Sequence, residues 1–406
     1  MTKLEQLIEE LCPEGVKEYR VADVADTFIG LATSVTKYKA DSGVQLLHNS
    51  DISEGKINVQ TLEYITDEFA QKNSKKLLRT NDIITVHTGD VGTSAIITEE
   101  FDGCIGFTTI SSRVKDTDFL IPEYLCVFLN SNLCKEQIAS KTISDRNNLN
   151  LASFDEILIP IPHIDIQREI VRILDNFAEL TAELTAELTA RKQQYDYYRN
   201  ELLDIKDADV PFKTLGELSK FRRGSFPQPY GNAEWYDGEG AMPFVQVADI
   251  GEDMRLVADT KRKISTVAQP KSVFAPSGSI IISLQGSIGR IAVTQYDAYI
   301  DRTVAIFQDI SKEILPKYFV YQLQRIFAIK EKTARGSTIK TITKEEFTSF
   351  SIAVPSINEQ ERIVEVLDKF HALCHDISDG LPAEIEGRRK QYEYYRDKLL
   401  TFKELT

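Results

Sequence analysis

Apolar residues recur at three- and four-residue intervals in two separate stretches of the chain. In the first stretch they are Ile170, Ile173, Phe177, Leu180 and Leu184, and in the second they are Ile363, Val366, Phe370, Leu373 and Ile377. This spacing places each set on one face of an amphipathic helix. Because the two stripes match, they favour packing together as an antiparallel coiled coil. The alternative is two independent helices, each packed on its own domain.

The two stretches belong to a longer internal repeat. Residues 162–177 align with residues 355–370, and both begin with the pattern Pro-x-Ile-x-x-Gln-x-x-Ile-Val. Further along, residues 194–199 align with residues 391–396 as Gln-Tyr-(Asp/Glu)-Tyr-Tyr-Arg. The chain is therefore a tandem duplication of a unit of roughly 195 residues.

Each copy begins with a part in which strand-like and helix-like segments are mixed. The apolar runs 83–86 and 279–282 are typical of buried strands, and each leads into a Gly-x-(Val/Ile)-Gly loop. The apolar runs 124–129 and 318–323 predict core helices. We therefore expect an α+β fold with a pseudo-two-fold internal repeat: two globular mixed α/β domains separated by two long antiparallel helical spacers. The expected boundaries are 1–160 and 207–354 for the domains, and 161–206 and 355–406 for the spacers.

The two helical spacers differ in detail. Residues 179–190 contain three copies of Glu-Leu-Thr-Ala, and each copy adds one helical turn, about 6 Å in length. Glu, Leu and Ala favour helix, so the first spacer should be continuous. In the second spacer, Gly380-Leu381-Pro382 should stop one helix and start another.

Charge is distributed unevenly between the two globular parts. The formal net charge of the chain is −14, which argues against DNA binding by charge alone. Residues 1–162 hold 15 basic and 25 acidic side chains, whereas residues 210–355 hold 19 basic and 15 acidic ones. Any grip on DNA must therefore be local or shared with a partner.

The sequence indicates no catalytic or metal site. There is no Pro-Pro pair for a methyltransferase motif of the Asn/Asp-Pro-Pro-aromatic type, and no GxxxxGK[ST] phosphate loop. His371 and His375 could share a metal on a helix with Cys374 between them, but further ligands are missing, so we expect a helix-surface or interface role. Five scattered cysteines without a CxxC pair fit reduced thiols in a cytoplasm, and neither a signal peptide nor a membrane-spanning run is predicted.

Basic and amide side chains in loops are the candidate DNA contacts, because Arg or Lys can hold guanine and Asn or Gln can hold adenine in a major groove. In the first globular part they are Lys72, Lys75, Lys76, His87, Arg113, Lys141, Arg146, Asn147 and Asn148. In the second they are Arg222, Arg223, Lys261, Arg262, Lys263, Gln285, Arg290, Arg302, Arg335, Ser337, Thr338 and Lys340. The stretches 141–148 and 335–340 occupy equivalent places in the repeat, which makes them stronger candidates for DNA contact than the other residues. The alternative is a solvated charge for each side chain, and a tight turn for the Gly-x-(Val/Ile)-Gly loops.

Apolar and tyrosine side chains of the helices are the candidates for spacer packing and partner contact. They are Ile170, Phe177, Leu184, Leu188, Tyr195, Tyr198, Ile363, Phe370, Ile377, Tyr392 and Tyr395. For the tyrosines the alternative is stacking on bases, but their place on a helix near a domain junction favours packing.

These motifs resemble those of the DNA-specificity subunit of Type I restriction-modification enzymes, over essentially the whole chain. The resemblance is carried by the duplicated helix starts, the Gly-x-(Val/Ile)-Gly loops, Gly336-Ser337-Thr338 and the Gln-Tyr-(Asp/Glu)-Tyr-Tyr-Arg helix ends. The Thr-Ala-Glu-Leu spacer is similar to that of one subgroup, in which the number of copies changes the gap in the DNA site. The resemblance implies two target-recognition domains, each reading one half of a split, asymmetric site in double-stranded DNA.

The resemblance also implies chemistry outside this chain. Two methyltransferase (modification) subunits would dock along the helices and domains and use S-adenosylmethionine to methylate adenine. Restriction (translocase) subunits would add ATP- and Mg²⁺-dependent translocation and cleavage, and this chain would hold no cofactor. Two other hypotheses stay open: a coiled-coil adaptor that does not read DNA, and the recognition portion of a fused restriction enzyme. For the second, 406 residues leave no room for nuclease and methyltransferase motifs.

Overall fold

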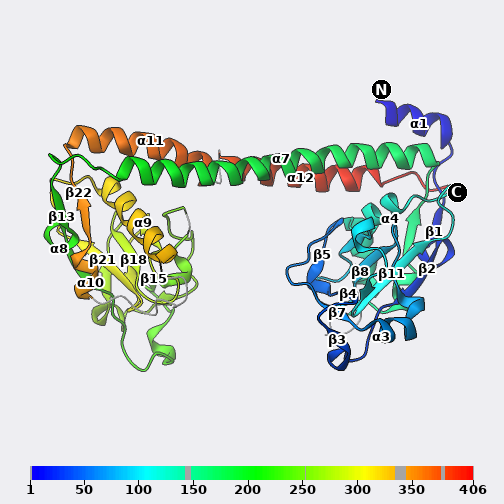
Figure 1. Ribbon diagram of the computed structural model, residues 1–406, viewed down its shortest axis with the longest axis horizontal. Coiled ribbons are helices and arrows are strands. Elements are labelled where there is room, and N and C mark those ends of the chain that lie inside the picture. Colours follow the sequence, from blue (N-terminus) through cyan, green and yellow to red (C-terminus); the bar gives the residue numbers. More distant parts are fainter. Residues whose placement is uncertain (1, 142–147, 252, 334–343, 376–379, 406) are drawn as a thin grey trace. The chain divides into compact units, whose positions relative to one another are not determined.

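The computed structural model describes residues 2–141, 148–251, 253–333, 344–375 and 380–405 (Figure 1). The chain divides into two compact units. Unit 1 holds Met1–Ala182 and Gly387–Thr406, and unit 2 holds Glu183–Glu386. Each unit therefore combines one globular domain, the beginning of the helical segment that follows it, and the end of the helical segment from the other repeat copy.

Unit 1 is built around a four-stranded antiparallel sheet in the order β2-β11-β8-β9. Its strands are β2 (Ala25–Ile29), β8 (Ile83–Val86), β9 (Ser94–Ile96) and β11 (Thr109–Val114). Every residue of β8 is buried, which confirms the strand predicted from the apolar run 83–86. A second sheet has the order β10-β4-β7-β3, and its β10–β4 pair is parallel. Its strands are β3 (Lys39–Ala40), β4 (Val44–Leu47), β7 (Tyr64–Ile65) and β10 (Ile105–Gly106).

Two short ribbons and a set of helices complete unit 1. The ribbons pair β1 (Glu18–Arg20) with β12 (Leu158–Pro160), and β5 (Ile52–Ser53) with β6 (Lys56–Ile57). The helices are α1 (Lys3–Leu11), α2 (Val21–Val24), α3 (Asp67–Lys72), α4 (Pro122–Leu129), α5 (Asn132–Lys141), α6 (Leu151–Asp155) and parts of α7 (Ile164–Leu203) and α12 (Leu381–Leu399). Helix α4 begins with a proline in its first turn, where the missing N–H costs no helical hydrogen bond.

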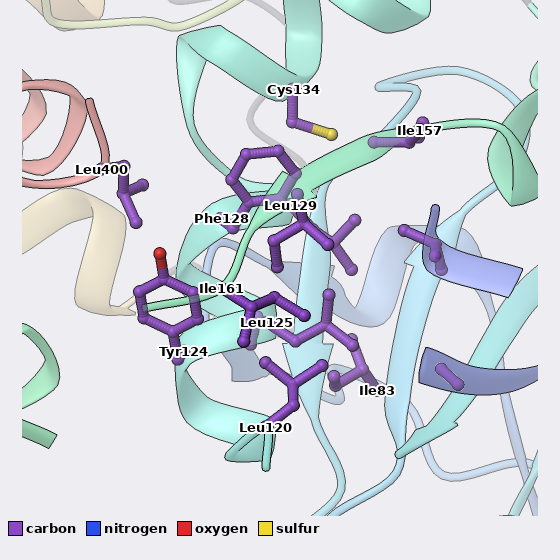
Figure 2. Close-up of a cluster of buried hydrophobic side chains, with 14 of the residues drawn as sticks. Ile83, Leu120, Tyr124, Leu125, Phe128, Leu129, Cys134, Ile157, Ile161 and Leu400 are labelled. Carbon is purple, nitrogen blue, oxygen red and sulfur yellow. The ribbon is translucent and has the colours of Figure 1, made fainter. Parts of the chain in front are cut away.

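The core of unit 1 lies between α4 and the antiparallel sheet (Figure 2). Tyr124 and Phe128 of α4 are almost completely buried there with Ile83 of β8. Leu400, which directly follows α12, is 1% exposed and belongs to the same cluster. The end of the chain is therefore an integral part of the first domain.

Unit 2 repeats this scheme with its own strands. Its antiparallel sheet has the order β14-β21-β18-β19, its second sheet the order β16-β15-β20-β17, and β13 pairs with β22. The strands are β13 (Phe212–Thr214), β14 (Lys220–Arg223), β15 (Met242–Val245), β16 (Lys263–Ile264), β17 (Val273–Ala275), β18 (Ile280–Ser283), β19 (Ile291–Val293), β20 (Ala298–Ile300), β21 (Val304–Gln308) and β22 (Ser351–Ala353). The β15–β20 pair is parallel, as is β4–β10 in unit 1.

The helices of unit 2 are α8 (Leu215–Leu218), α9 (Pro316–Thr333), α10 (Lys344–Ser349), α11 (Ile357–His375) and the second part of α7. Helix α8 starts with a capping box in which Thr214 and Glu217 satisfy each other's backbone N–H groups. The core helices predicted from the apolar runs 124–129 and 318–323 are confirmed by α4 and α9.

The long helices pack in antiparallel fashion within each unit. In unit 1 the rings of Phe177 in α7 and Tyr395 in α12 stack at a centroid distance of 5.5 Å. In unit 2 Tyr198 in α7 stacks on Phe370 in α11, also at 5.5 Å. Later residues of α7 thus meet earlier residues of its partner helices, which confirms the antiparallel packing. The prediction that the two stripes pack on each other is wrong: Phe177 of the first stripe packs on Tyr395, and Phe370 of the second packs on Tyr198, each within its own unit. Helix α7 is continuous through the Glu-Leu-Thr-Ala copies, and α12 begins at Leu381, at the predicted break.

The predicted apolar stripes are buried only in part. Ile170 and Ile363 are 0% and 1% exposed, but Leu180 and Leu373 are 47% and 38% exposed. The globular domains cover the first turns of the helices, so burial ends before the stripe does. Ile377 lies outside the described residues.

The glutamine of each Pro-x-Ile-x-x-Gln motif fixes the start of its helix. Gln167 accepts a hydrogen bond from the Ile121 N–H at 3.1 Å and donates to the carbonyls of Phe119 and Pro162. Gln360 makes the same three bonds in unit 2, to Leu315, Glu313 and Pro355. Both glutamines are 0% exposed, so this repeated motif is a buried structural joint.

Among the described residues, no helix is both long and apolar enough to cross a membrane.

Candidate nucleic-acid interface

Several polar segments meet at one edge of the sheets in unit 1. The segment after β4, which continues into the 3-10 turn Asn49–Asp51, lies beside the turn after β8. The Asn49 amide donates to the Thr88 carbonyl at 3.0 Å and to the Thr108 hydroxyl at 3.3 Å. The Phe107 N–H donates to the Leu47 carbonyl at 2.8 Å, which extends the β4–β10 pairing to this edge. These bonds bring together segments that are far apart in the sequence.

The same edge includes the end of the stretch 141–148. The Thr88 hydroxyl donates to the Asn148 side-chain oxygen at 2.7 Å, and the Leu149 N–H donates to the His87 carbonyl at 3.0 Å. His87 Nδ1 lies 2.8 Å from the Thr88 hydroxyl. Two segments that the sequence analysis singled out separately are therefore in contact through His87, Thr88 and Asn148.

The glycines of the Gly-x-(Val/Ile)-Gly loops serve two purposes. All four have positive φ: 100° at Gly89, 92° at Gly92, 72° at Gly286 and 85° at Gly289. A Cβ on Gly92 would stand 2.8 Å from the Ile138 side chain, and one on Gly289 would stand 2.6 Å from a ring atom of Phe327. Nothing lies within 4 Å of the same point at Gly89 or Gly286. The second glycine is thus required for packing, and the first lies where backbone can approach a ligand closely.

The equivalent edge of unit 2 carries arginines. The Leu284 N–H donates to the Thr303 carbonyl at 2.7 Å, which joins the glycine turn to the β20–β21 link. Arg223, at the end of β14, donates from Nε to the Arg302 carbonyl at 2.6 Å. Both arginines are exposed, and Gln285 is half-buried in the adjoining turn.

A cluster of aromatic side chains in unit 2 lies next to the segment that carries Arg302. Phe226, Trp235 and Phe244 are buried in one cluster, with Tyr230 and Tyr236 packed against it. Three cations lie over rings of this cluster: Arg302 over Tyr230 at 5.2 Å, Arg262 over Tyr236 at 4.6 Å and Lys271 over Trp235 at 4.8 Å. Cations placed on aromatic rings in this way are held in a defined position.

Several predicted DNA-contacting side chains are bonded inside their own unit. The ammonium groups of Lys76 and Lys141 donate to the carbonyls of Gly30 and Glu156, and Arg290 donates to the Ile250 carbonyl. The salt bridges are Arg113–Asp82, Lys72–Glu68 and Lys263–Asp259. All six cations thus use N–H donors inside their unit, and the three salt bridges also offset the charge of Arg113, Lys72 and Lys263. A part of these side chains in DNA binding stays a prediction.

The remaining candidates divide into two groups. Lys75, Arg222 and Lys261 are exposed and their charged groups have no partner among the described residues. Arg146, Asn147, Arg335, Ser337, Thr338 and Lys340 lie outside the described residues. The sequence-based candidates did not include Asn49 and Gln246, which lie in the equivalent segments after β4 and β15; Gln246 itself corresponds to His48. The repeat was the signal that could have found these segments.

The predicted spacer and partner residues include several core residues. Ile170, Ile363 and Tyr195 are buried, and Tyr195 donates to Gln324 at 3.1 Å. Leu184, Leu188 and Tyr392 are half-buried. Tyr198 and Tyr395 are 40% and 39% exposed, and each stacks on one phenylalanine of the partner helix.

His371 and His375 form a stacked pair, with ring centroids 4.4 Å apart. Tyr195 contacts both rings, at 5.9 Å and 5.8 Å. Burial, followed by the neighbouring His375, lowers the pKa of His371 to about 4. Within the described ranges, no group of three or more His, Cys, Asp or Glu side chains is placed to hold a metal ion. The two rings pack on each other and on Tyr195, and the lowered pKa of His371 keeps that imidazole neutral near pH 7.

Comparison with known proteins places this arrangement in a family. The sequence profile of the Type I restriction modification DNA specificity domain matches residues 13–191 and 208–387. The chain is 40% identical over 271 residues to the Type I restriction enzyme EcoR124I/EcoR124II specificity subunit of Escherichia coli, covering 62% of this chain and 65% of that protein. It is 32% identical over 267 residues to the putative type I restriction enzyme specificity subunit S.HindORF215P of Haemophilus influenzae, covering 64% of this chain and 67% of that protein.

A chain from a solved structure of the type I R-M system has the same fold. Its TM-score is 0.66 at 21% sequence identity, with 96% of this chain and 98% of that chain covered. The duplicated profile match covers most of the sequence, and each match includes one domain with its helices. The chain therefore belongs to the family of Type I restriction-modification DNA specificity subunits.

Proposed function

We propose that this subunit reads a bipartite site in double-stranded DNA, with domain 1–160 reading one half and domain 207–354 the other. The observation that carries the proposal is that two units of one fold present different side chains at the same edge. Unit 1 presents the neutral Asn49, Thr88 and Asn148, whereas unit 2 presents Arg223 and Arg302. Different hydrogen-bonding groups on one scaffold select different bases.

The Glu-Leu-Thr-Ala copies would set the gap between the half-sites, as in the subgroup with a Thr-Ala-Glu-Leu spacer. The division between the units falls at Ala182 and Glu183, inside these copies. One copy lengthens a helix by about 6 Å, which is comparable to one or two base pairs of about 3.4 Å each. A change in copy number therefore changes the gap and leaves both reading surfaces intact.

Two methyltransferase subunits would dock on the helix pairs, one on each unit. Each pair carries an exposed leucine and two exposed tyrosines at matched positions of the repeat. In unit 1, Leu180, Tyr394 and Tyr395 are 47%, 62% and 39% exposed; in unit 2, Leu373, Tyr197 and Tyr198 are 38%, 61% and 40% exposed. Tyrosines of this kind are enriched at protein interfaces. A surface that occurs twice suits two copies of one partner.

The chemistry of such a complex would reside in the partners. The methyltransferase subunits would bind S-adenosylmethionine, and the restriction subunits would bind ATP and Mg²⁺. The complex would work in the cytoplasm, where it meets DNA.

A domain exchange tests the two-domain reading. Residues 207–354 are replaced by the equivalent domain of another specificity subunit, and the methylated site of the assembled complex is sequenced. One half-site should change while the other half-site and the gap remain. A change in both halves contradicts the proposal, and methylation without sequence preference would favour the adaptor hypothesis.

A further inference from the structure

We infer that Arg302 reads a guanine in the half-site of the second domain and that Tyr230 positions it for this role. The inference rests on the proposed function and names the base that one side chain selects. It would make Arg302 a specificity-determining residue and Tyr230 a positioning residue.

Two hydrogen bonds of its hydroxyl group fix the position of the Tyr230 ring. Its hydroxyl donates to Asp301 Oδ1 at 2.6 Å and accepts a hydrogen bond from the Gln246 amide at 3.1 Å. Asp301 is 3% exposed, and its second oxygen accepts from the Thr303 hydroxyl at 2.7 Å. Burial and the carboxylate of Asp301 raise the pKa of Tyr230, so the hydroxyl remains a donor at neutral pH.

Backbone packing holds Arg302 in place above this ring. The N–H of the preceding residue, Asp301, donates to the Val245 carbonyl at 3.0 Å, and the Arg302 carbonyl accepts from Arg223 at 2.6 Å. Gly224 lies against the same link: a Cβ there would stand 2.3 Å from the Asp301 carbonyl oxygen. Contacts with Val245 and with Arg223 and Gly224 therefore restrict the movement of the link that carries Arg302.

The guanidinium of Arg302 is held but not neutralised. It lies over the Tyr230 ring at 5.2 Å, and no ion pair or hydrogen bond joins its nitrogens to another described residue. By contrast, Arg113 in unit 1 is paired with Asp82, with Nε and Nη2 both donating to the carboxylate. An exposed arginine stacked on a ring keeps its N–H fork for a ligand, at a low cost in side-chain entropy.

A fixed guanidinium fork matches guanine better than any other base. Guanine presents two acceptors, O6 and N7, at one edge in the major groove, and an arginine can donate to both at once. In unit 1 the equivalent link holds Phe107 and Thr108, so no arginine stands there. We therefore expect a guanine in one half-site only.

The test compares full-length variants assembled with the methyltransferase subunit and selected on random duplex DNA. Arg302→Ala should abolish the preference for G·C at one position of one half-site, a loss of about 5- to 150-fold for the favoured base. The other half-site and the gap should not change. Arg302→Lys keeps the charge but not the fork, so it should restore affinity without restoring the full preference.

Lys220→Ala is the matched control, because Lys220 is an exposed cation of the same domain, at the start of β14, and its charge is paired with Asp309. It should leave every base preference unchanged. Tyr230→Leu removes the platform and should weaken the same G·C preference as Arg302→Ala, with thermal unfolding of both variants showing that the domain stays folded.

Two outcomes overturn the inference. A uniform loss of affinity for all sequences, with a salt dependence reduced by about one phosphate contact, would mean that Arg302 binds the backbone. An unchanged motif would mean that it does not face DNA. If the wild-type complex itself selects no bipartite motif, the proposed function fails together with the inference. If the wild type selects such a motif and the Arg302 variants do not alter it, only the inference fails.

Discussion

The Thr88 hydroxyl donates a hydrogen bond to the Asn148 side-chain oxygen at 2.7 Å, and this bond joins the glycine turn after β8 to the end of the polar stretch 141–148. It orients an exposed amide at the edge of the first domain. An oriented Asn amide can pair with adenine through N6 and N7. In the proposed function, this bond would connect the geometry of the turn with the choice of base.

Asn148→Ala and Thr88→Val should relax base preference in the half-site of the first domain. We expect a loss of about 5- to 150-fold at one position, with Asn148→Ala having the larger effect because it removes the base-contacting group itself. Sequencing of DNA retained by the assembled complex measures this. Lys75→Ala is the control, because this exposed lysine should affect affinity for all sequences alike. A change in the half-site that responds to Arg302 variants would contradict the assignment.

Deletion of Thr185–Leu188 should shorten the gap in the DNA site by one or two base pairs. The deletion removes one turn of α7, about 6 Å, without touching either domain. The methylated sites of the wild-type and shortened subunits are compared by sequencing. Thr185→Ala, which keeps the length of the helix, should leave the gap as it is. The idea of the helix as a ruler is wrong if the half-sites change too.

Tyr394→Ala and Tyr197→Ala should each release one methyltransferase subunit. Their side chains are 62% and 61% exposed at matched positions on the two units. Loss of an interface tyrosine commonly weakens binding by about tenfold or more. Native mass spectrometry gives the stoichiometry: we expect one bound copy for each single variant and none for the double variant. Glu183→Ala, an exposed change on the same helix, should retain both copies; retention of both copies by the double variant would rule out these surfaces.

Gln167→Leu should destabilise unit 1 by about 2–4 kcal/mol, because it leaves a buried N–H and two carbonyls without their partner. Gln360→Leu should do the same to unit 2. Denaturant unfolding curves measure both effects. Gln193→Leu, an exposed change on α7, should shift stability by no more than about 0.5 kcal/mol. Equal stability of all three variants would show that the motif glutamine has no structural role.

Unit 2 should lose stability as the pH falls from 7 to 5. The pKa of His371 is about 4 in the folded protein, below the ordinary histidine value of about 6.5, so the unfolded chain binds the proton more readily in this window. The free energy of unfolding therefore decreases as the pH falls below about 6.5. Denaturant unfolding at pH 7 and pH 5 should show a smaller difference for His371→Gln than for the wild type. An identical pH dependence in both proteins would contradict the role assigned to His371.

Much of the fold could be predicted because its signals are local and occur twice. The run 83–86 forms β8, the run 124–129 lies in α4, and α12 begins at Leu381, where the sequence predicted a helix start. The apolar stripe of the first helix includes Leu180, but this side chain is exposed in the structure. The pattern of apolar residues does not show how far a domain covers its helix.

The sheet edge that carries the candidate DNA contacts was only partly predictable from the sequence, because it depends on pairing between distant strands. Asn49 reaches Thr88, and Gln246 reaches Tyr230, only through the folding of the second sheet. The charge of Lys141 was visible in the sequence, but its bond to the Glu156 carbonyl was not. Long-range hydrogen bonds decide which polar side chains remain for a ligand, and they leave no local pattern.

Selection of random duplex DNA by the subunit assembled with its methyltransferase partner tests the two-domain reading most directly. Sequencing of the retained DNA should show two different short motifs at a fixed separation, with at least one G·C pair in the half assigned to Arg302. A single continuous motif, two halves at variable separation, or retention of all sequences alike would contradict it.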